Sequence, residues 1–399
     1  MKNTGGQVRK KVEKIIETVR AEGDSAVSRW TEKFDGVKLS PGKFAVNTDD
    51  IFNSGRHIDR GLKKAILSSK KNIELFHREE LKRIKKTWTI KTGDCKLGQV
   101  IRPVENAGIY VSGGRYNYPS VVLMTAIPAL VAGVKDIVMV TPPGNLTAPV
   151  LFAAKCAGIK RIFRVGGAQA IAALAIGTET IPKVDFIAGP GNEYVTEAKR
   201  QLFGEAGIDL LAGPSELAVI TDGNANPEAV AYDLLAQAEH SPEAKVWLFS
   251  SSKRFTGLVK RALYSKTKNK KQFNFTSAGI NALIRRVNDV APEHLEIMLK
   301  NPHSIIPRIK NAGAIFVGDY SPVALGDYYA GPSHVLPTNA TARFSSGLCA
   351  QTFMKCTSII EYTRGALKKA AGPVMKLAES EKLYNHAKSL ECRFTGGRA

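Results

Sequence analysis

Hydrophobic positions at the start of the chain recur every three or four residues, which is the period of an α-helix. This spacing predicts one helix over 8–21, which ends at Gly23, and a second over 25–34. A long and highly charged helix is predicted over 58–86, and its polarity argues against a central position in the fold. Residues 87–103 are predicted to form a β-ribbon or an extended connection.

From residue 108 onward, short apolar runs alternate with helical runs. The runs that predict strands are 109–111, 137–140, 162–165, 184–187, 217–220, 246–249 and 314–317. The runs that predict helices are 121–131, 149–156, 168–176, 193–203, 227–240 and 253–264. This alternation, with largely apolar strands, predicts parallel sheets that helices cover on both faces. Ligand sites are then expected at the carboxyl ends of the strands.

The segment after residue 347 has a different pattern. It is predicted to be helical over 367–388, with a break at Gly372-Pro373, and it carries few apolar positions. We expect it to dock elsewhere, for example on a partner subunit. The length of 399 residues suggests two to three structural units rather than one core.

The chain is strongly basic, with a formal net charge of +21. Such a charge can indicate contact with nucleic acid or with anionic ligands. Basic residues concentrate in 63–96 and 253–271, and apolar residues at helical spacing interrupt the second run. This is the pattern of a solvated surface helix, and aromatic residues that could stack on bases are sparse there. We therefore disfavour nucleic acid as the main partner.

No stretch approaches the roughly 18–20 consecutive apolar residues of a membrane span. The polar, basic N-terminus also lacks the apolar core of a signal peptide. Five cysteines are scattered along the chain without a Cys-x-x-Cys pair, which predicts free thiols in a reducing compartment. The expected location is the cytoplasm, with no membrane partner.

Four glycine-rich turns punctuate the alternating region, at 111–114, 166–169, 189–192 and 213–215. Such turns let the backbone approach a phosphate group at a helix N-terminus. None is the Gly-x-Gly-x-x-Gly dinucleotide fingerprint, and each alone is also ordinary punctuation between a strand and a helix. If the four turns share one edge of a parallel sheet, they favour a ligand cleft there.

The hexapeptide 291–296 places a carboxylate and an imidazole side by side. Pro292 presets φ, so Glu293 and His294 are expected at the stiff start of an element. Glu and His are common general acid–base groups, and their surroundings can tune either toward neutral pH. A solvated helix start with an acidic first turn explains the same residues, so both interpretations stay open.

Candidate metal donors are also present. Gln237 and His240 are three residues apart at the end of a predicted helix, so they lie on one face. Other candidate donors follow later, at Asp327, His334, Glu381 and His386. Two histidines with carboxylate and amide oxygens would suit a borderline divalent ion such as Zn²⁺. Spacing alone does not join these positions into one site.

Several motifs follow one another in a specific order. They are EGDSA (22–26), YPS (118–120), VGGAQAIA (165–172), GPGN (189–192), AGPSE (212–216), QAEH (237–240), APEHLE (291–296) and HVLPT (334–338). Together they resemble the histidinol dehydrogenase family over nearly the whole chain. The resemblance implies an α/β fold with two incomplete Rossmann-like parallel-sheet domains and an extended C-terminal helical tail, intertwined in a homodimer.

The expected domain organisation has three parts. Residues 1–109 with 217–347 would form a Rossmann-like domain that carries the metal and acid–base residues. Residues 110–216 would form the Rossmann-like domain on the NAD side. Residues 348–399 would form the dimerisation segment.

The resemblance also implies a site for NAD, L-histidinol and one Zn²⁺ per subunit. Glu293 and His294 would be the catalytic acid–base pair. The implied metal ligands are Gln237, His240, Asp327 and His386. The implied substrate contacts are Ser215, Gln237, His240, His294, Asp327, His334, Glu381 and His386. The implied NAD contacts are Tyr110, Gln169 and Asn192, and the neighbouring subunit would donate Glu381 and His386.

The implied reaction is the NAD-dependent, four-electron oxidation of L-histidinol through L-histidinal to L-histidine, the last step of histidine biosynthesis. Zinc would orient the substrate through its imidazole and amine. His294 would take the alcohol proton, and Glu293 would activate water. Two alternatives remain: a zinc- and NAD-dependent relative that acts on another amino alcohol or polyol, and a basic nucleic-acid-binding protein on this scaffold.

Overall fold

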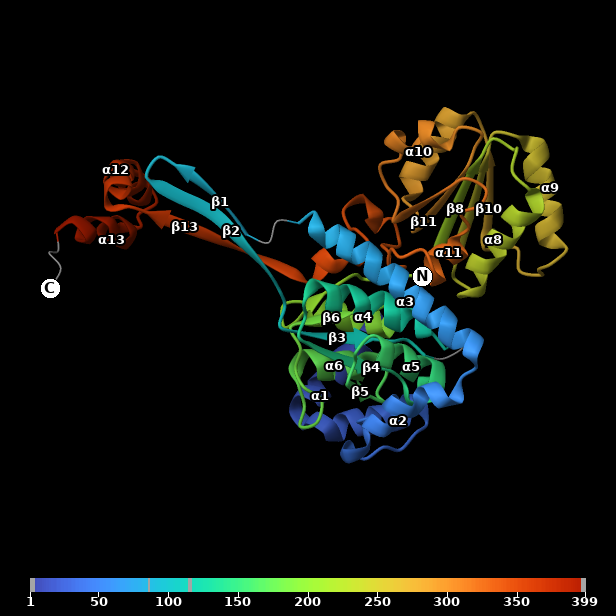
Figure 1. Cartoon of the computed structure of the whole chain (residues 1–399), viewed down its shortest axis with the longest axis horizontal. Helices are drawn as coiled ribbons and strands as arrows, with labels where there is room; N and C mark the ends of the chain where they lie inside the picture. The colour runs from blue at the N-terminus through green and yellow to red at the C-terminus, as the bar shows by residue number, and fades with distance from the viewer. Residues whose placement is uncertain (1–3, 85–86, 114–116, 396–399) are drawn as a thin grey trace. The chain divides into compact units, whose positions relative to one another are not determined.

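The structure is a computed structural model that describes residues 4–84, 87–113 and 117–395 (Figure 1). Gly114, the last residue of the turn predicted over 111–114, lies outside the described residues. The chain divides into two compact units. The large unit comprises Met1–Leu81 and Val104–Phe353, and the small unit comprises Lys82–Pro103 and Met354–Ala399.

The first sheet of the large unit has five parallel strands in the order β5-β4-β3-β6-β7. Its strands are β3 (Asn106–Tyr110), β4 (Asp136–Val140), β5 (Arg161–Phe163), β6 (Phe186–Ala188) and β7 (Gly207–Ile208). The connecting helices are α4 (Pro119–Ala132), α5 (Ala148–Cys156), α6 (Gly167–Ile176) and α7 (Glu193–Leu202). The alternation predicted from the sequence is therefore confirmed for this half, although the short strand β7 was not predicted.

The N-terminal helix α1 (Thr4–Asp35) packs on α6 and α7. Its apolar stripe, which includes Val12 and Val19, is buried in the same core as α6. The predicted interruption at Gly23 is confirmed as a kink, with φ 53° and ψ −130°. The expected domain organisation grouped 1–109 with 217–347. In the structure, the apolar stripe of α1 packs in one core with α6, and β3 belongs to the first sheet, so these parts of 1–109 belong with the first sheet instead.

The second sheet also has five parallel strands, in the order β10-β9-β8-β11-β12. Its strands are β8 (Glu216–Thr221), β9 (Lys245–Ser250), β10 (Phe273–Ser277), β11 (His294–Met298) and β12 (Ala314–Val317). Helices α8 (Pro227–Glu239) and α9 (Lys253–Tyr264) share one apolar core with the sheet, and α10 (Ile280–Val290) contributes to a second core. Three more helices of this unit are α2 (Thr48–Asn53), α3 (Arg60–Lys82) and α11 (Val323–Tyr328).

Strand β11 corrects one of the two interpretations of the hexapeptide 291–296. Helix α10 ends at Val290, and Ala291 adopts a left-handed φ of 46°. The chain then passes Pro292 and enters a strand in which every residue is buried. The solvated helix start is therefore wrong, and Glu293 and His294 stand at the start of a buried parallel strand.

The small unit is built on an antiparallel sheet in the order β1-β2-β13. Strands β1 (Thr87–Thr92) and β2 (Cys95–Pro103) confirm the predicted ribbon, and β13 (Met354–Tyr362) pairs with β2. Helices α12 (Arg364–Ser380) and α13 (Tyr384–Thr395) follow. The predicted break at Gly372-Pro373 is wrong, because α12 continues through Pro373. The chain turns instead at Lys382, which has a left-handed φ of 61°.

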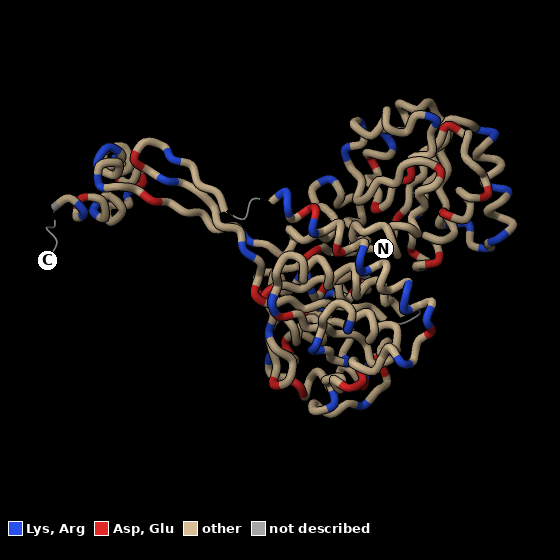
Figure 2. The backbone as a smooth tube through the Cα atoms, viewed as in Figure 1, with Lys and Arg blue, Asp and Glu red and all other residues tan. Residues whose placement is uncertain are grey.

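Among the described residues, none of the helices has the length and apolar character that a membrane crossing requires. Lys and Arg positions are distributed through both units and are interspersed with Asp and Glu (Figure 2). The net charge of +21 is therefore not concentrated in a single element.

Candidate active site

The candidate acid–base pair lies where the second sheet begins. His294 is the first residue of β11 and is in register with Leu217 near the start of β8. Helix α8 returns from the carboxyl end of β8 to the start of β9, so its last turn, with Gln237 and His240, reaches the same edge. This edge is the amino end of the strands. The expected carboxyl-end location is therefore wrong for these residues.

The backbone of Glu216 holds both members of the pair. Its N–H donates to Glu293 Oε2 at 2.8 Å, and its carbonyl oxygen lies 3.0 Å from His294 Nδ1. Because a carbonyl can only accept, the His294 Nδ1 must carry the proton in this contact. The lone pair of the neutral imidazole is then on Nε2, where it can take a proton. The Glu216 backbone thus fixes the tautomer of a candidate base.

Burial sets the protonation of this pair. It raises the pKa of Glu293 well above its usual value, and nearby Asp327 and Glu216 add to the rise. Burial lowers the pKa of His294 to about 4, with a further lowering from His334 and His240. His294 is therefore uncharged at neutral pH, while Glu293 is a stronger base than an exposed carboxylate.

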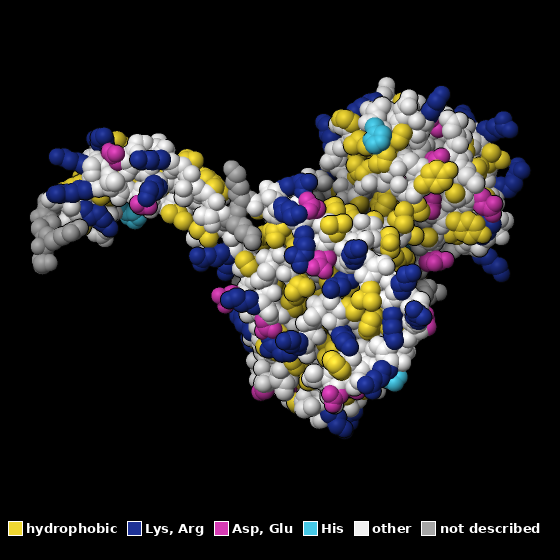
Figure 3. Space-filling model, in the orientation of Figure 1, with side chains coloured by type: hydrophobic (Ala, Val, Ile, Leu, Met, Phe, Trp, Pro, Cys, Tyr) yellow, Lys and Arg dark blue, Asp and Glu magenta, His cyan; other side chains and the backbone are white. Residues whose placement is uncertain are grey.

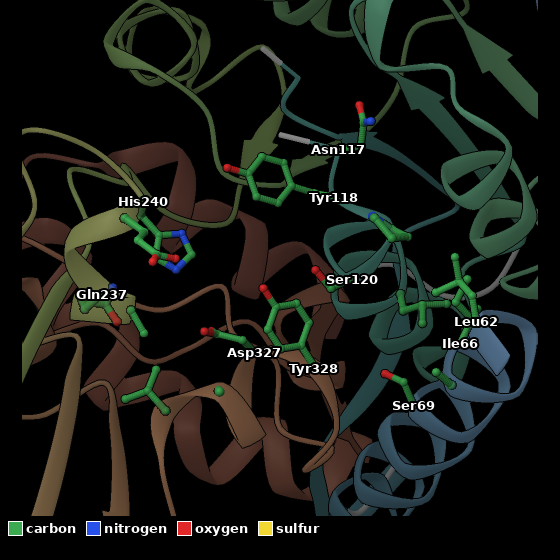
Figure 4. A pocket seen from close by; sticks show the side chains of 17 residues that line it. Leu62, Ile66, Ser69, Asn117, Tyr118, Ser120, Gln237, His240, Asp327 and Tyr328 are labelled. Atoms are coloured by element: carbon green, nitrogen blue, oxygen red, sulfur yellow. The ribbon is translucent and has the colours of Figure 1, made fainter. Parts of the chain in front are cut away.

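A cavity of about 540 Å³ brings three of the implied metal ligands together (Figure 4). Gln237 and His240 enter it from the end of α8, and Asp327 points toward them from α11. Asp327 is the penultimate residue of this short helix. The opposite wall is formed by α3, with Leu62, Ile66 and Ser69, and by the start of α4.

The donor atoms that line the cavity are of the types that bind a divalent ion, but they do not complete its set of ligands. Burial raises the pKa of Asp327 to about 7, and among the described residues no Lys or Arg pairs with it. A cation would relieve that cost, and imidazole, carboxylate and amide oxygen suit Zn²⁺. Within the described part of the chain, however, no three His, Cys, Asp or Glu side chains form a metal cluster. A complete site needs at least one further ligand.

Two implied substrate contacts flank this region. His334 Nδ1 lies 3.0 Å from the carbonyl oxygen of Asp327, so its Nε2 also carries the free lone pair. Burial lowers the pKa of His334 to about 4, with a further lowering from His240. Ser215 directly precedes β8 and its carbonyl accepts the Lys245 N–H. Ser215 therefore lies at the amino edge of the second sheet, and His334 lies beside Asp327.

The implied NAD contacts share the carboxyl edge of the first sheet, as expected. Tyr110 ends β3, and its hydroxyl accepts the Gly167 N–H at 3.1 Å, while burial raises its pKa to about 12. Gln169 is fully buried in the first turn of α6, and neither atom of its amide has a partner among the described residues. Asn192 caps α7 by accepting the Tyr194 and Val195 N–H groups.

The other two implied residues belong to the small unit. Glu381 caps α12, and His386 lies in α13. Both are exposed in that unit. Their participation in the site remains a proposal.

The comparisons with known proteins agree over nearly the whole length. A family model described as "Histidinol dehydrogenase" matches residues 1–394. The chain belongs to the histidinol dehydrogenase family. It is 44% identical to the histidinol dehydrogenase of Listeria monocytogenes, over 98% of this chain and 94% of that protein. It is 45% identical to that of Thermosynechococcus vestitus, over 96% of this chain and 92% of that protein.

A solved member of the histidinol dehydrogenase family has the same fold. The crystal structure from Elizabethkingia anophelis superimposes with a TM-score of 0.89 at 35% sequence identity, covering 97% of this chain and 92% of that chain. The similarity thus includes both parallel sheets. It confirms the α/β fold that the motifs implied.

Some residues of this family member escaped the sequence reasoning. Glu216 was quoted only as part of the AGPSE motif, yet its backbone positions both candidate acid–base residues. Tyr118 and Tyr328 line the cavity and were not singled out. Glu216 acts through its backbone, which is the same in almost every residue type, so its identity could not reveal the role. The only signal in the sequence was its position next to Ser215, an implied substrate contact.

Proposed function

We propose that the chain catalyses the NAD-dependent oxidation of L-histidinol through L-histidinal to L-histidine, the last reaction of histidine biosynthesis. Family membership over residues 1–394 carries this proposal. The cavity supports it, because Gln237, His240 and Asp327 converge there from separate elements. The test is steady-state turnover of histidinol against other amino alcohols and polyols, with added Zn²⁺. Absence of histidinol turnover would contradict the proposal.

Different residues of the chain carry out the proton transfers and orient the substrate. NAD would supply the hydride acceptor for both oxidations, and a divalent ion such as Zn²⁺ would hold the imidazole and the amine of the substrate. His294 Nε2 takes the proton of the alcohol, since its Nδ1 is committed to Glu216. Glu293 takes a proton from the water that hydrates the aldehyde, and its raised pKa suits it to this step. Ser215, His334 and Glu381 orient the substrate.

For the metal, we propose Gln237, His240, Asp327 and His386 as ligands. His240→Ala is expected to weaken Zn²⁺ binding by about 100-fold or more, because the incomplete donor set of the cavity then loses its imidazole. Zinc content after dialysis against a weak chelator measures this. The matched control is His303→Ala, which removes an exposed histidine of the same unit. Equal zinc retention in both variants would remove His240 from the ligand set.

We propose that the small unit is completed by a second copy of the chain. In the paired strands Trp88, Ile90, Leu97, Ile360 and Tyr362 fall on one face of the sheet, since the register places Ile90 and Ile360 on either side of Leu97. All but Leu97 are exposed, with Ile360 at 74%. Figure 3 shows exposed hydrophobic side chains on this unit.

An exposed apolar face of this kind requires a cover. Among the described residues of the small unit, the buried apolar side chains are alanines, such as Ala366, Ala371 and Ala378, which supply little core of their own. A partner subunit that covers the sheet would also bring its own tail near a neighbouring cavity. His386 of the tail would then supply the ligand that the cavity lacks.

A complementation experiment tests this sharing of sites. Neither His240→Ala nor His386→Ala is expected to be active alone. When the two variants are co-expressed, a mixed dimer joins one intact cavity with one intact tail. About a quarter of the wild-type activity is then expected, because half of the dimers are mixed and each has one complete site. No recovery in verified mixed dimers would contradict donation by the neighbour.

We also propose a cytoplasmic location. All five cysteines, which lie among the described residues, are free thiols in the structure. Free thiols of this number are typical of a reducing compartment.

A further inference from the structure

A buried ion pair lies beneath the glycine-rich turn that follows β6. The ammonium group of Lys199, on α7, is paired with the carboxylate of Asp209, in the segment after β7. Their side chains are only 2% and 1% exposed. Neither residue belongs to the candidate acid–base, metal, substrate or NAD sets. A buried pair of this kind needs a structural reason, because removing two charges from water is costly.

The remaining contacts of the pair converge on one residue. Lys199 Nζ donates to the Gly189 carbonyl oxygen at 2.8 Å, and Asp209 Oδ2 accepts the Gly189 N–H at 2.7 Å. Both polar groups of Gly189 are thus occupied from inside the protein. Lys199 completes its coordination by donating to the Leu210 carbonyl oxygen at 3.2 Å.

Only glycine fits at position 189 in this backbone conformation. Its φ is +121°, and a Cβ there would lie 2.0 Å from the carbonyl oxygen of Tyr110. The turn therefore packs directly against the end of β3. Three residues later Asn192 caps α7. Because Gly189 touches the backbone of Tyr110 and lies three residues before Asn192, its conformation determines how Tyr110 and Asn192 lie relative to each other.

We infer that the Lys199–Asp209 pair is a positioning element that holds the 189–192 turn in the shape that binds NAD. The inference rests on the proposed function, in which Tyr110 and Asn192 contact NAD. The pair occupies the inward-facing groups of Gly189, so the outer part of the turn is left to the cofactor. A fixed turn needs no reorganisation when the cofactor binds.

The test compares two sets of variants on the same helix. Lys199→Met alone leaves the Asp209 carboxylate buried without a cation, so the main variant is the double change Lys199→Met with Asp209→Leu. The control is Arg200→Met, which breaks the neighbouring exposed ion pair with Glu197. In the double variant, the KM for NAD and the Kd for NAD are expected to rise about tenfold or more. The KM for histidinol and the kcat at saturating NAD should stay within about twofold of the control.

A merely structural role would lower thermal stability without separating the two KM values. A folded double variant with unchanged NAD affinity would overturn the inference, as would a parallel rise of both KM values. Hydrogen exchange in the wild-type enzyme gives a second measurement that requires no variant. The Gly189 amide should be protected before NAD is added, and rapid exchange there would also overturn the inference. Failure of the wild-type protein to bind NAD would instead contradict the proposed function.

Discussion

His294→Asn is expected to abolish both oxidations, with a loss of about 10²–10⁴-fold in kcat for each. The side-chain amide of Asn can still donate to the Glu216 carbonyl oxygen, which accepts from His294 Nδ1 at 3.0 Å. The fold of the strand start is therefore preserved. The substitution removes the basic Nε2 lone pair, which takes the hydroxyl proton of the alcohol in the first oxidation and that of the aldehyde hydrate in the second.

Separate assays with histidinol and with histidinal, at saturating NAD, measure the two losses. The matched control is His303→Asn, at an exposed histidine in the 3₁₀ turn Pro302–Ser304. If His294→Asn kept more than about a tenth of the wild-type rate in either assay, His294 could not be the general base for that step.

The elements of the fold that carry simple periodicity were predictable. The apolar runs of β4 and β9 and the amphipathic spacing of α9 (Lys253–Tyr264) correspond closely to the observed elements. These segments are governed by local burial, and local burial repeats with the period of the element. Strand β11 escaped because it begins with His294 and contains Glu296, and such polar side chains are typical of exposed positions although both are buried here.

Convergence of the site was not predictable from spacing. Periodicity placed Gln237 and His240 on one helix face, but it does not relate that face to Asp327, which lies on a different element. Only the resemblance to a family joined these positions. The pairing of β13 with β2 was missed for the same reason, since strand partners distant in sequence leave no local signal.

A count of acidic residues in the sequence does not show which of them are buried and hold the structure together, as Glu296 does in the large unit. Glu296 accepts the Val323 N–H at 2.9 Å at the start of α11, and burial together with nearby Asp233 raises its pKa well above the usual value. The sequence treats this glutamate as one of many acidic residues. In the structure it anchors the helix that carries Asp327, and so links a strand of the sheet to the candidate metal ligand.

Glu293→Gln is expected to separate the two half-reactions. In the wild-type structure the Glu216 N–H donates to Glu293 Oε2 at 2.8 Å. The side-chain oxygen of Gln can accept the same hydrogen bond, so the local structure should persist. Alcohol oxidation depends on His294 and should stay within about threefold of wild type. Aldehyde oxidation loses the base that activates water and should fall by about 10²–10⁴-fold.

Product analysis and pH dependence together measure this separation. The yield should drop from about two NADH per histidinol to about one, with histidinal trapped by an added hydrazine. In the wild type, burial raises the pKa of Glu293, so aldehyde oxidation should increase with pH as the carboxyl loses its proton at a pH above the usual range for Glu. The base acts only when deprotonated, and this acidic limb should disappear in Glu293→Gln. Equal loss of both oxidations, or an unchanged acidic limb, would show that Glu293 is not the base for the second step.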